Sequence, residues 1–153
     1  MNFARICLVS FLTLAFSTSF GAEPDSKQIE NDVMGVLDEF MITFSASDPE
    51  GHTGTYHFPH FRLNPQGQML TWETRDDAIQ MHYLLFEKLP STGWHRSEWA
   101  ERKITSISES KVHVATKIRR VREDGSEIFL AESLYVLTKV DGRWAIKLRS
   151  SYI

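Results

Sequence analysis

Apolar residues recur at helical spacing over residues 26–46, and acidic residues occupy the opposite side of that stretch. This period of three and four predicts one long amphipathic helix. A second, short helix is predicted from Asp48-Pro49-Glu50, because Asp suits the position before a helix and Pro suits its first turn. The apolar positions of the long helix are Ile29, Val33, Val36, Leu37, Phe40, Met41 and Phe44.

Two short strands and a third helix are predicted next. Residues 61–64 and 68–73 have the composition of strands, and the turn sequence Pro-Gln-Gly lies between them. Thr74 can cap the helix that follows, and Pro90 marks its end.

From Trp94 onward the apolar period changes from helical to alternating, which is typical of strands. Asp124-Gly125 and Asp141-Gly142 separate alternating runs and predict tight hairpins, since both residue types tolerate positive φ. The C-terminal half is therefore predicted to be an antiparallel meander of four long strands, which must twist and curve. The predicted order is α-α-β-β-α-β-β-β-β. It describes an α+β fold in which a curved antiparallel sheet of about six strands wraps on two to three helices.

The N-terminal segment has the pattern of a secretory signal peptide. One positive charge precedes an almost wholly apolar run from Ile6 to Phe16, and small residues lead to Gly21. The run of about 11 residues is too short for a membrane-spanning helix, which needs roughly 20. We therefore predict an exported protein, periplasmic or secreted, with a signal peptide at 1–21. A single domain at 22–153 and no stable membrane anchor are expected.

Composition and charge narrow the classes of function. The chain of 153 residues is 42% hydrophobic and 24% charged, which favours a packed globular domain. Its only cysteine, Cys7, lies in the predicted signal, so the mature chain would have no thiol chemistry. Loss of Arg5 with the signal makes the mature chain one unit more negative than the −3 of the whole chain. This negative charge disfavours nucleic acid as a partner.

The predicted order and several local sequences resemble the nuclear transport factor 2-like superfamily, including its SnoaL-like and ketosteroid-isomerase-like members. The resemblance covers about residues 25–153, and it implies a cone with an internal pocket and a homodimer formed through the sheet. Catalytic members use a pocket Asp as base, but the Asp residues of this chain are explained by helix starts and turns. The resemblance is carried by Asp48-Pro49-Glu50, His57-Phe58-Pro59-His60, Trp72, the run 93–97, the ending 141–146 and Arg149-Ser150-Ser151.

Two histidines, His57 and His60, are the candidate catalytic residues. An imidazole titrates near pH 6.5, which suits a general base in a pocket. Two other interpretations stay open. The rings can pack structurally under the rim of the cone, or both can bind one metal ion, although zinc needs three or four ligands. No metal and no cofactor is expected.

Candidate ligand-binding residues are aromatic and basic. The residues 94–99 alternate along a strand, so His95 and Trp99 share one side and Trp94 lies on the other. Arg119 belongs to a basic patch that is otherwise explained as a solvated hairpin end. Arg149 can hold a carboxylate bidentately or pair with an acid on the neighbouring strand. The full set is Trp72, Trp94, His95, Trp99, Arg119, Tyr135 and Arg149.

Three functions are compatible with this sequence. The preferred one is a non-enzymatic domain that binds an unknown small molecule in its cone. The second is an isomerase, dehydratase or cyclase with His57 or His60 as base. The third is a dimeric interaction module that acts through the outer face of the sheet.

Overall fold

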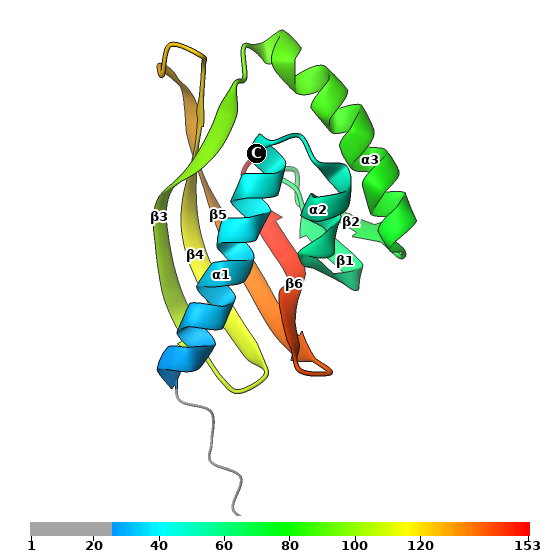
Figure 1. Cartoon of the computed structure of the whole chain (residues 1–153), viewed down its shortest axis with the longest axis vertical. Helices are drawn as coiled ribbons and strands as arrows, with labels where there is room; N and C mark the ends of the chain where they lie inside the picture. Colours follow the sequence, from blue (N-terminus) through cyan, green and yellow to red (C-terminus); the bar gives the residue numbers. More distant parts are fainter. Residues whose placement is uncertain (1–25) are drawn as a thin grey trace, which may run out of the picture.

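A computed structural model describes residues 26–153, so the predicted signal peptide lies outside the described residues. Three helices and one short 3-10 helix cover one face of a six-stranded sheet (Figure 1). The elements are α1 (Ser26–Ser45), α2 (Pro49–Gly54), β1 (Tyr56–Leu63), β2 (Met69–Trp72), α3 (Arg75–Lys88), η1 (Leu89–Thr92), β3 (Arg96–Ile107), β4 (Lys111–Val121), β5 (Glu127–Val140) and β6 (Arg143–Ser151).

The helices begin where the sequence predicts them to begin. The side chain of Asp48 accepts a hydrogen bond from the Gly51 amide at the start of α2, with Pro49 in the first turn. At the start of α3, Thr74 and Asp77 form a reciprocal capping box. These local contacts satisfy amides that a helix leaves unpaired at its N-terminus.

The strand order is β2-β1-β6-β5-β4-β3. The β3–β4, β4–β5 and β5–β6 pairs are antiparallel, which confirms the predicted meander. Both Asp-Gly hairpins are present, and Asp141 and Gly142 have φ values of 50° and 80°. The β1–β6 pair is parallel, so the sheet is mixed where the sequence predicts an antiparallel one. No turn signal marks this pairing, because the rest of the fold separates the two strands in sequence.

The core lies between α1 and the concave face of the sheet. Phe40 of α1 is 3% exposed and contacts the rings of Tyr56, Trp99 and Tyr135 from three strands. A smaller apolar cluster of Phe44, Phe86, Leu89 and Trp94 joins α1 to α3 and the start of β3. Burial of these aromatic side chains is the main force that holds the helices on the sheet.

The two long helices are attached to different degrees. Along α1, the indole Nε1 of Trp99 donates to the Leu37 carbonyl, and Arg102 Nη1 pairs with Asp38 Oδ1 at 2.6 Å. Seven residues of α1 are buried. In α3 only Ala78, His82 and Phe86 are buried. The α1 wall of the cone is therefore fixed more firmly than the α3 wall.

Candidate functional site

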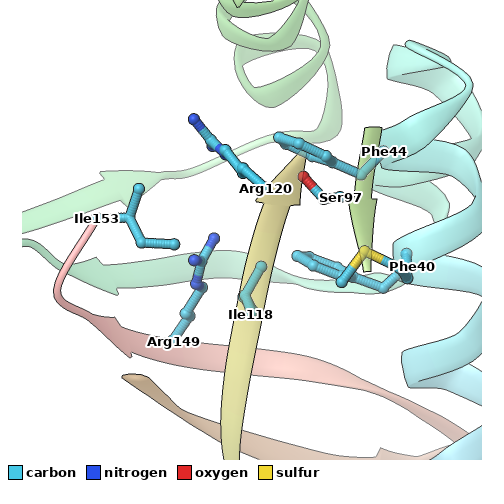
Figure 2. Close-up of a pocket in the computed structure, with 8 residues that line it drawn as sticks. Phe40, Phe44, Ser97, Ile118, Arg120, Arg149 and Ile153 are labelled. Atoms are coloured by element: carbon cyan, nitrogen blue, oxygen red, sulfur yellow. The ribbon is translucent and has the colours of Figure 1, made fainter. Parts of the chain in front are cut away.

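A cavity of about 200 Å³ lies inside the cone, between the helices and the sheet. It is bounded by the end of α1, by α2 and α3, and by β1, β2, β4 and β6. A second space of about 10 Å³ adjoins it and shares Phe44, Arg120, Arg149 and Ile153 with it (Figure 2). The larger cavity is lined by Phe44, His52, Tyr56, His60, Arg62, Trp72, Met81, His82, Leu85, Arg120, Arg149 and Ile153.

Three histidines in the cavity wall share one hydrogen-bond pattern, which fixes their tautomer. In each, Nδ1 lies within 3.1 Å of a main-chain carbonyl: Phe40 for His52, Ile146 for His60 and Ala78 for His82. A carbonyl oxygen only accepts, so Nδ1 carries the proton in all three rings. In the neutral form Nε2 is then the acceptor.

Burial keeps these histidines neutral near pH 7. Removal from water lowers the pKa of His60 and of His82 to about 4. The same cause, together with the nearby His82, lowers the pKa of His52 well below its usual value. The three rings therefore offer the cavity neutral acceptor nitrogens.

One of the acceptor nitrogens is already used. The hydroxyl of Tyr56 donates to His82 Nε2 across 3.3 Å, which joins β1 to α3. Among residues 26–153, no hydrogen bond reaches Nε2 of His60, although that ring lines the cavity. The His60 ring stacks on Tyr56, with centroids 3.9 Å apart, and lies 5.8 Å from Trp72.

Three arginines from three strands also line the cavity: Arg62 of β1, Arg120 of β4 and Arg149 of β6. Burial and the neighbouring Arg149 lower the pKa of Arg62 and lower that of Arg120 to about 10. Arginine side chains are cationic at neutral pH. The wall of the cavity thus combines rings, neutral imidazoles and positive charge.

The structure brings some of the predicted site residues to this cavity. His60, Trp72 and Arg149 line it directly. Tyr135 is fully buried, and Arg149 lies over its ring, with Cζ 5.4 Å from the centroid. Tyr135 therefore contacts Arg149 but does not itself line the cavity.

Four other predicted residues lie outside the cavity lining. His57 points to the opposite face of β1, where its Nδ1 lies 2.9 Å from Thr138 Oγ1. Trp94 belongs to the smaller apolar cluster, and Trp99 is packed under α1. His95 is exposed just before β3. Alternation along β1 explains why His60, and not His57, faces inward.

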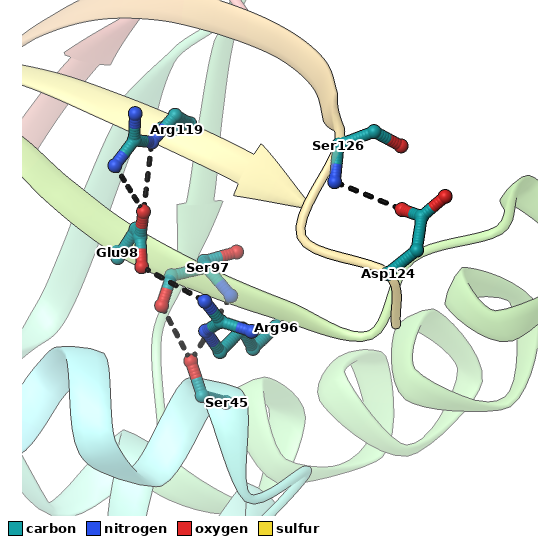
Figure 3. A network of polar contacts seen from close by, with 7 residues as sticks. All are labelled: Ser45, Arg96, Ser97, Glu98, Arg119, Asp124 and Ser126. Carbon is teal, nitrogen blue, oxygen red and sulfur yellow. Dashed lines mark hydrogen bonds and ion pairs between the residues drawn. The ribbon is translucent and has the colours of Figure 1, made fainter. Parts of the chain in front are cut away.

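Arg119 also lies outside the cavity. Its Nε donates to Glu98 Oε1 at 2.7 Å, and Glu98 also contacts Arg96 (Figure 3). This network is on the outer side of the β3–β4 pair. The guanidinium of Arg119 is therefore paired with Glu98 and lies outside the cavity lining.

Five polar residues that line the cavity were not predicted as site residues: His52, Tyr56, Arg62, His82 and Arg120. For Arg120 alone among them, the strand pattern in the sequence predicts an inward side chain. The alternating series Val112, Val114, Thr116 and Ile118 continues to Arg120, so the strand period itself turns this arginine inward.

Residues 26–153 contain neither a metal-binding cluster nor a membrane-spanning helix. No three His, Cys, Asp or Glu side chains gather closely enough to hold a metal ion. No helix in this part of the chain has both the length and the apolar character needed to cross a membrane.

Fold and cavity together define a cone of the nuclear transport factor 2-like class, which suggests a ligand-binding or enzyme-like domain. A family model described as NTF2-like protein (DUF6841) matches residues 30–149, and the chain belongs to this family. Among curated proteins, none matches the sequence.

Solved structures with the same fold are similar in shape but distant in sequence. A Nostoc punctiforme domain with a cystatin-like fold is 17% identical and has a TM-score of 0.69, covering 84% of this chain and 78% of its own. An NTF2-like protein from Shewanella oneidensis is 13% identical, with a TM-score of 0.64 and coverages of 82% and 99%. A Catenulispora acidiphila protein in complex with S-DNPA is 17% identical, with a TM-score of 0.64 and coverages of 82% and 93%. At these identities the likeness concerns the fold alone.

Proposed function

We propose that this protein binds a small molecule in the cavity of its cone. The observation that carries the proposal is the cavity of about 200 Å³, whose wall combines rings with polar groups of fixed orientation. Such a wall gives an apolar ligand surface to bury and a few directional contacts for selectivity. The complex of the Catenulispora protein with S-DNPA supports the proposal by likeness of fold.

A fragment screen read at the indole N–H signal of Trp72 tests this function. Fragments that bind should shift this signal, because Trp72 lines the cavity. Leu85→Trp, which fills the cavity, should weaken binding at least tenfold. Leu84→Trp is the matched control, since Leu84 is 59% exposed on the same helix. Equal binding by both variants would place the ligand elsewhere.

A second candidate function, an acid–base enzyme, is favoured by His60. Its Nδ1–H is held by the Ile146 carbonyl, so Nε2 is left as a proton acceptor at the cavity. An anionic ligand beside the ring would raise the pKa of His60 from about 4 toward neutrality. Cavity ligands incubated with the protein in D₂O should then take up deuterium at carbon. His60→Gln should slow this exchange by about 100-fold or more, and an unchanged rate would exclude the role.

Export is a further part of the proposal, and the N-terminal signal pattern supports it. The N-terminal residue of protein recovered from outside the cytoplasm tests export. Ala22 at that position would support it, and Met1 would oppose it.

Dimerisation is the last part of the proposal. The outer face of the sheet supports a homodimer, because Leu130 and Leu134 are 49% and 36% exposed there. Light scattering that gives the mass of one chain at high concentration would contradict the dimer.

A further inference from the structure

Three cationic side chains line one cavity inside the cone, and no acidic side chain of residues 26–153 lies beside them. The ion pairs of residues 26–153 involve Arg96, Arg102, Lys117 and Arg119, and none involves Arg62, Arg120 or Arg149. Neither of the two adjoining cavities is lined by an Asp or a Glu. Apart from the main-chain oxygen of Ile153, the last residue, which Arg62 contacts, no acidic group of residues 26–153 therefore compensates the positive charge of the site.

The donors of these arginines are also largely unused. The Nε atoms of Arg62, Arg120 and Arg149 are buried and have no hydrogen-bond acceptor, and the hydroxyl of Tyr135 is in the same state. Arg62 Nη2 donates to a main-chain oxygen of Ile153, the last residue, and Arg149 Nη2 is 3.5 Å from Ser133 Oγ, at the limit of a hydrogen bond. A buried donor without an acceptor costs free energy, and here several gather in one place.

Ring contacts hold two of the guanidinium groups in position. Arg120 Cζ lies 5.5 Å from the ring centroid of Phe44 and 5.1 Å from that of Phe129. Arg149 is placed in the same way over Tyr135. Figure 2 shows both arginines extending beside Ile153, from β4 and from β6. Stacking on rings orients a guanidinium while leaving its N–H groups free to donate.

We infer that Arg62, Arg120 and Arg149 bind the anionic head group, a carboxylate or a phosphate, of a small organic ligand. Its apolar body lies against the rings of Trp72 and Phe44 in the same cavity. The inference rests on the proposed function and names the class of ligand. Guanidinium groups match the paired oxygens of both head groups, and the anion supplies the acceptors and the charge that the site lacks.

The unpartnered Nε atoms provide the test. In ¹⁵N-labelled protein, titration with benzoate or phenyl phosphate should shift the Nε–Hε signals of Arg120 and Arg149, while benzamide, a neutral analogue of benzoate, should bind at least tenfold more weakly. Single Arg→Met variants assign each signal. Comparison of benzoate with phenyl phosphate shows which head group the site prefers.

A matched pair of variants completes the experiment. Arg120→Met and Arg149→Met should each weaken binding of the preferred anion at least tenfold. Arg119→Met should not, because Arg119 neighbours Arg120 in sequence but pairs with Glu98 outside the cone. Equal affinity for benzamide with stationary Nε signals would overturn the anionic class and leave cavity binding intact. Absence of any shift with all three probes would overturn it too, and the fragment screen at Trp72 decides the proposed function separately.

Discussion

Acidification from pH 7 to pH 4 is expected to lower the free energy of unfolding by about 6 kcal/mol, a large part of the roughly 5–15 kcal/mol that stabilises an ordinary domain. His60 and His82 account for this loss, because burial lowers the pKa of each from 6.5 to about 4. His52 adds to it, since burial lowers its pKa well below the usual value too. Below pH 6.5 these histidines bind protons in the unfolded chain, whereas in the folded protein they stay unprotonated until the pH nears 4. Stability is therefore fully present above pH 6.5 and is lost as the pH falls toward 4, at roughly 3 kcal/mol for each histidine.

Urea denaturation at pH 7.5, 6, 5 and 4 measures this effect. His60→Gln and His82→Gln should each flatten the pH dependence, since an amide can keep a donor and an acceptor but does not titrate. His95→Gln is the control, because His95 is exposed and should leave the slope unchanged. A wild-type slope that survives the double substitution at residues 60 and 82 would assign the effect to other groups.

Phe40→Ala is expected to cost about 3–5 kcal/mol of folding free energy. The ring of Phe40 is 3% exposed and lies 4.3 Å from His52 and 5.3 Å from Tyr135, measured between centroids. Its loss opens a void at the point where α1, α2 and the sheet meet. Such a void is not refilled easily, because side chains from three layers are already packed around it.

The urea midpoint at pH 7.5 is the measurement for this substitution. Ile42→Ala is the matched control, since Ile42 is 63% exposed on the same helix and should change stability by less than about 0.5 kcal/mol. Similar losses in the two variants would mean that Phe40 is not the centre of the core.

The fold could be predicted largely from local signals. The apolar period of α1, the caps of α2 and α3, and the two Asp-Gly hairpins are encoded within a few residues of one another, and the structure confirms each. The parallel contact of β1 with β6 is different. It joins strands far apart in sequence, and no spacing or turn residue along the chain records such a pairing.

The candidate site could be predicted only in part, because it depends on which face each strand turns inward. In β5, apolar residues occupy both faces, so Leu134 outside and Leu137 inside could not be told apart by hydrophobicity. In β6, the register to β5 shifts around Lys147. This bulge turns Arg149 to the same side as Ile146, although simple alternation would separate them.

The clustering of the histidines could not be predicted from local sequence either. His52 and His82 look like ordinary helical residues, and only the fold reveals that they lie 4.7 Å apart, between ring centroids. Arg62 likewise becomes part of the site only when β1 pairs with β6. The three arginines meet in the cone because the sheet pairs their strands, so no local sequence pattern could predict that they lie together.

The weak attachment of α3 sets the kinetics of access to the cone. Three buried residues and side-chain hydrogen bonds to Tyr56 and Glu50 hold α3 as the outer wall of the cavity, whereas α1 buries seven residues. Fluctuations that admit a ligand will therefore follow the lower-energy route, in which α3 swings away while α1 stays in place. Association should then be slower than diffusion and nearly independent of ligand charge, with its rate set by how often this wall opens.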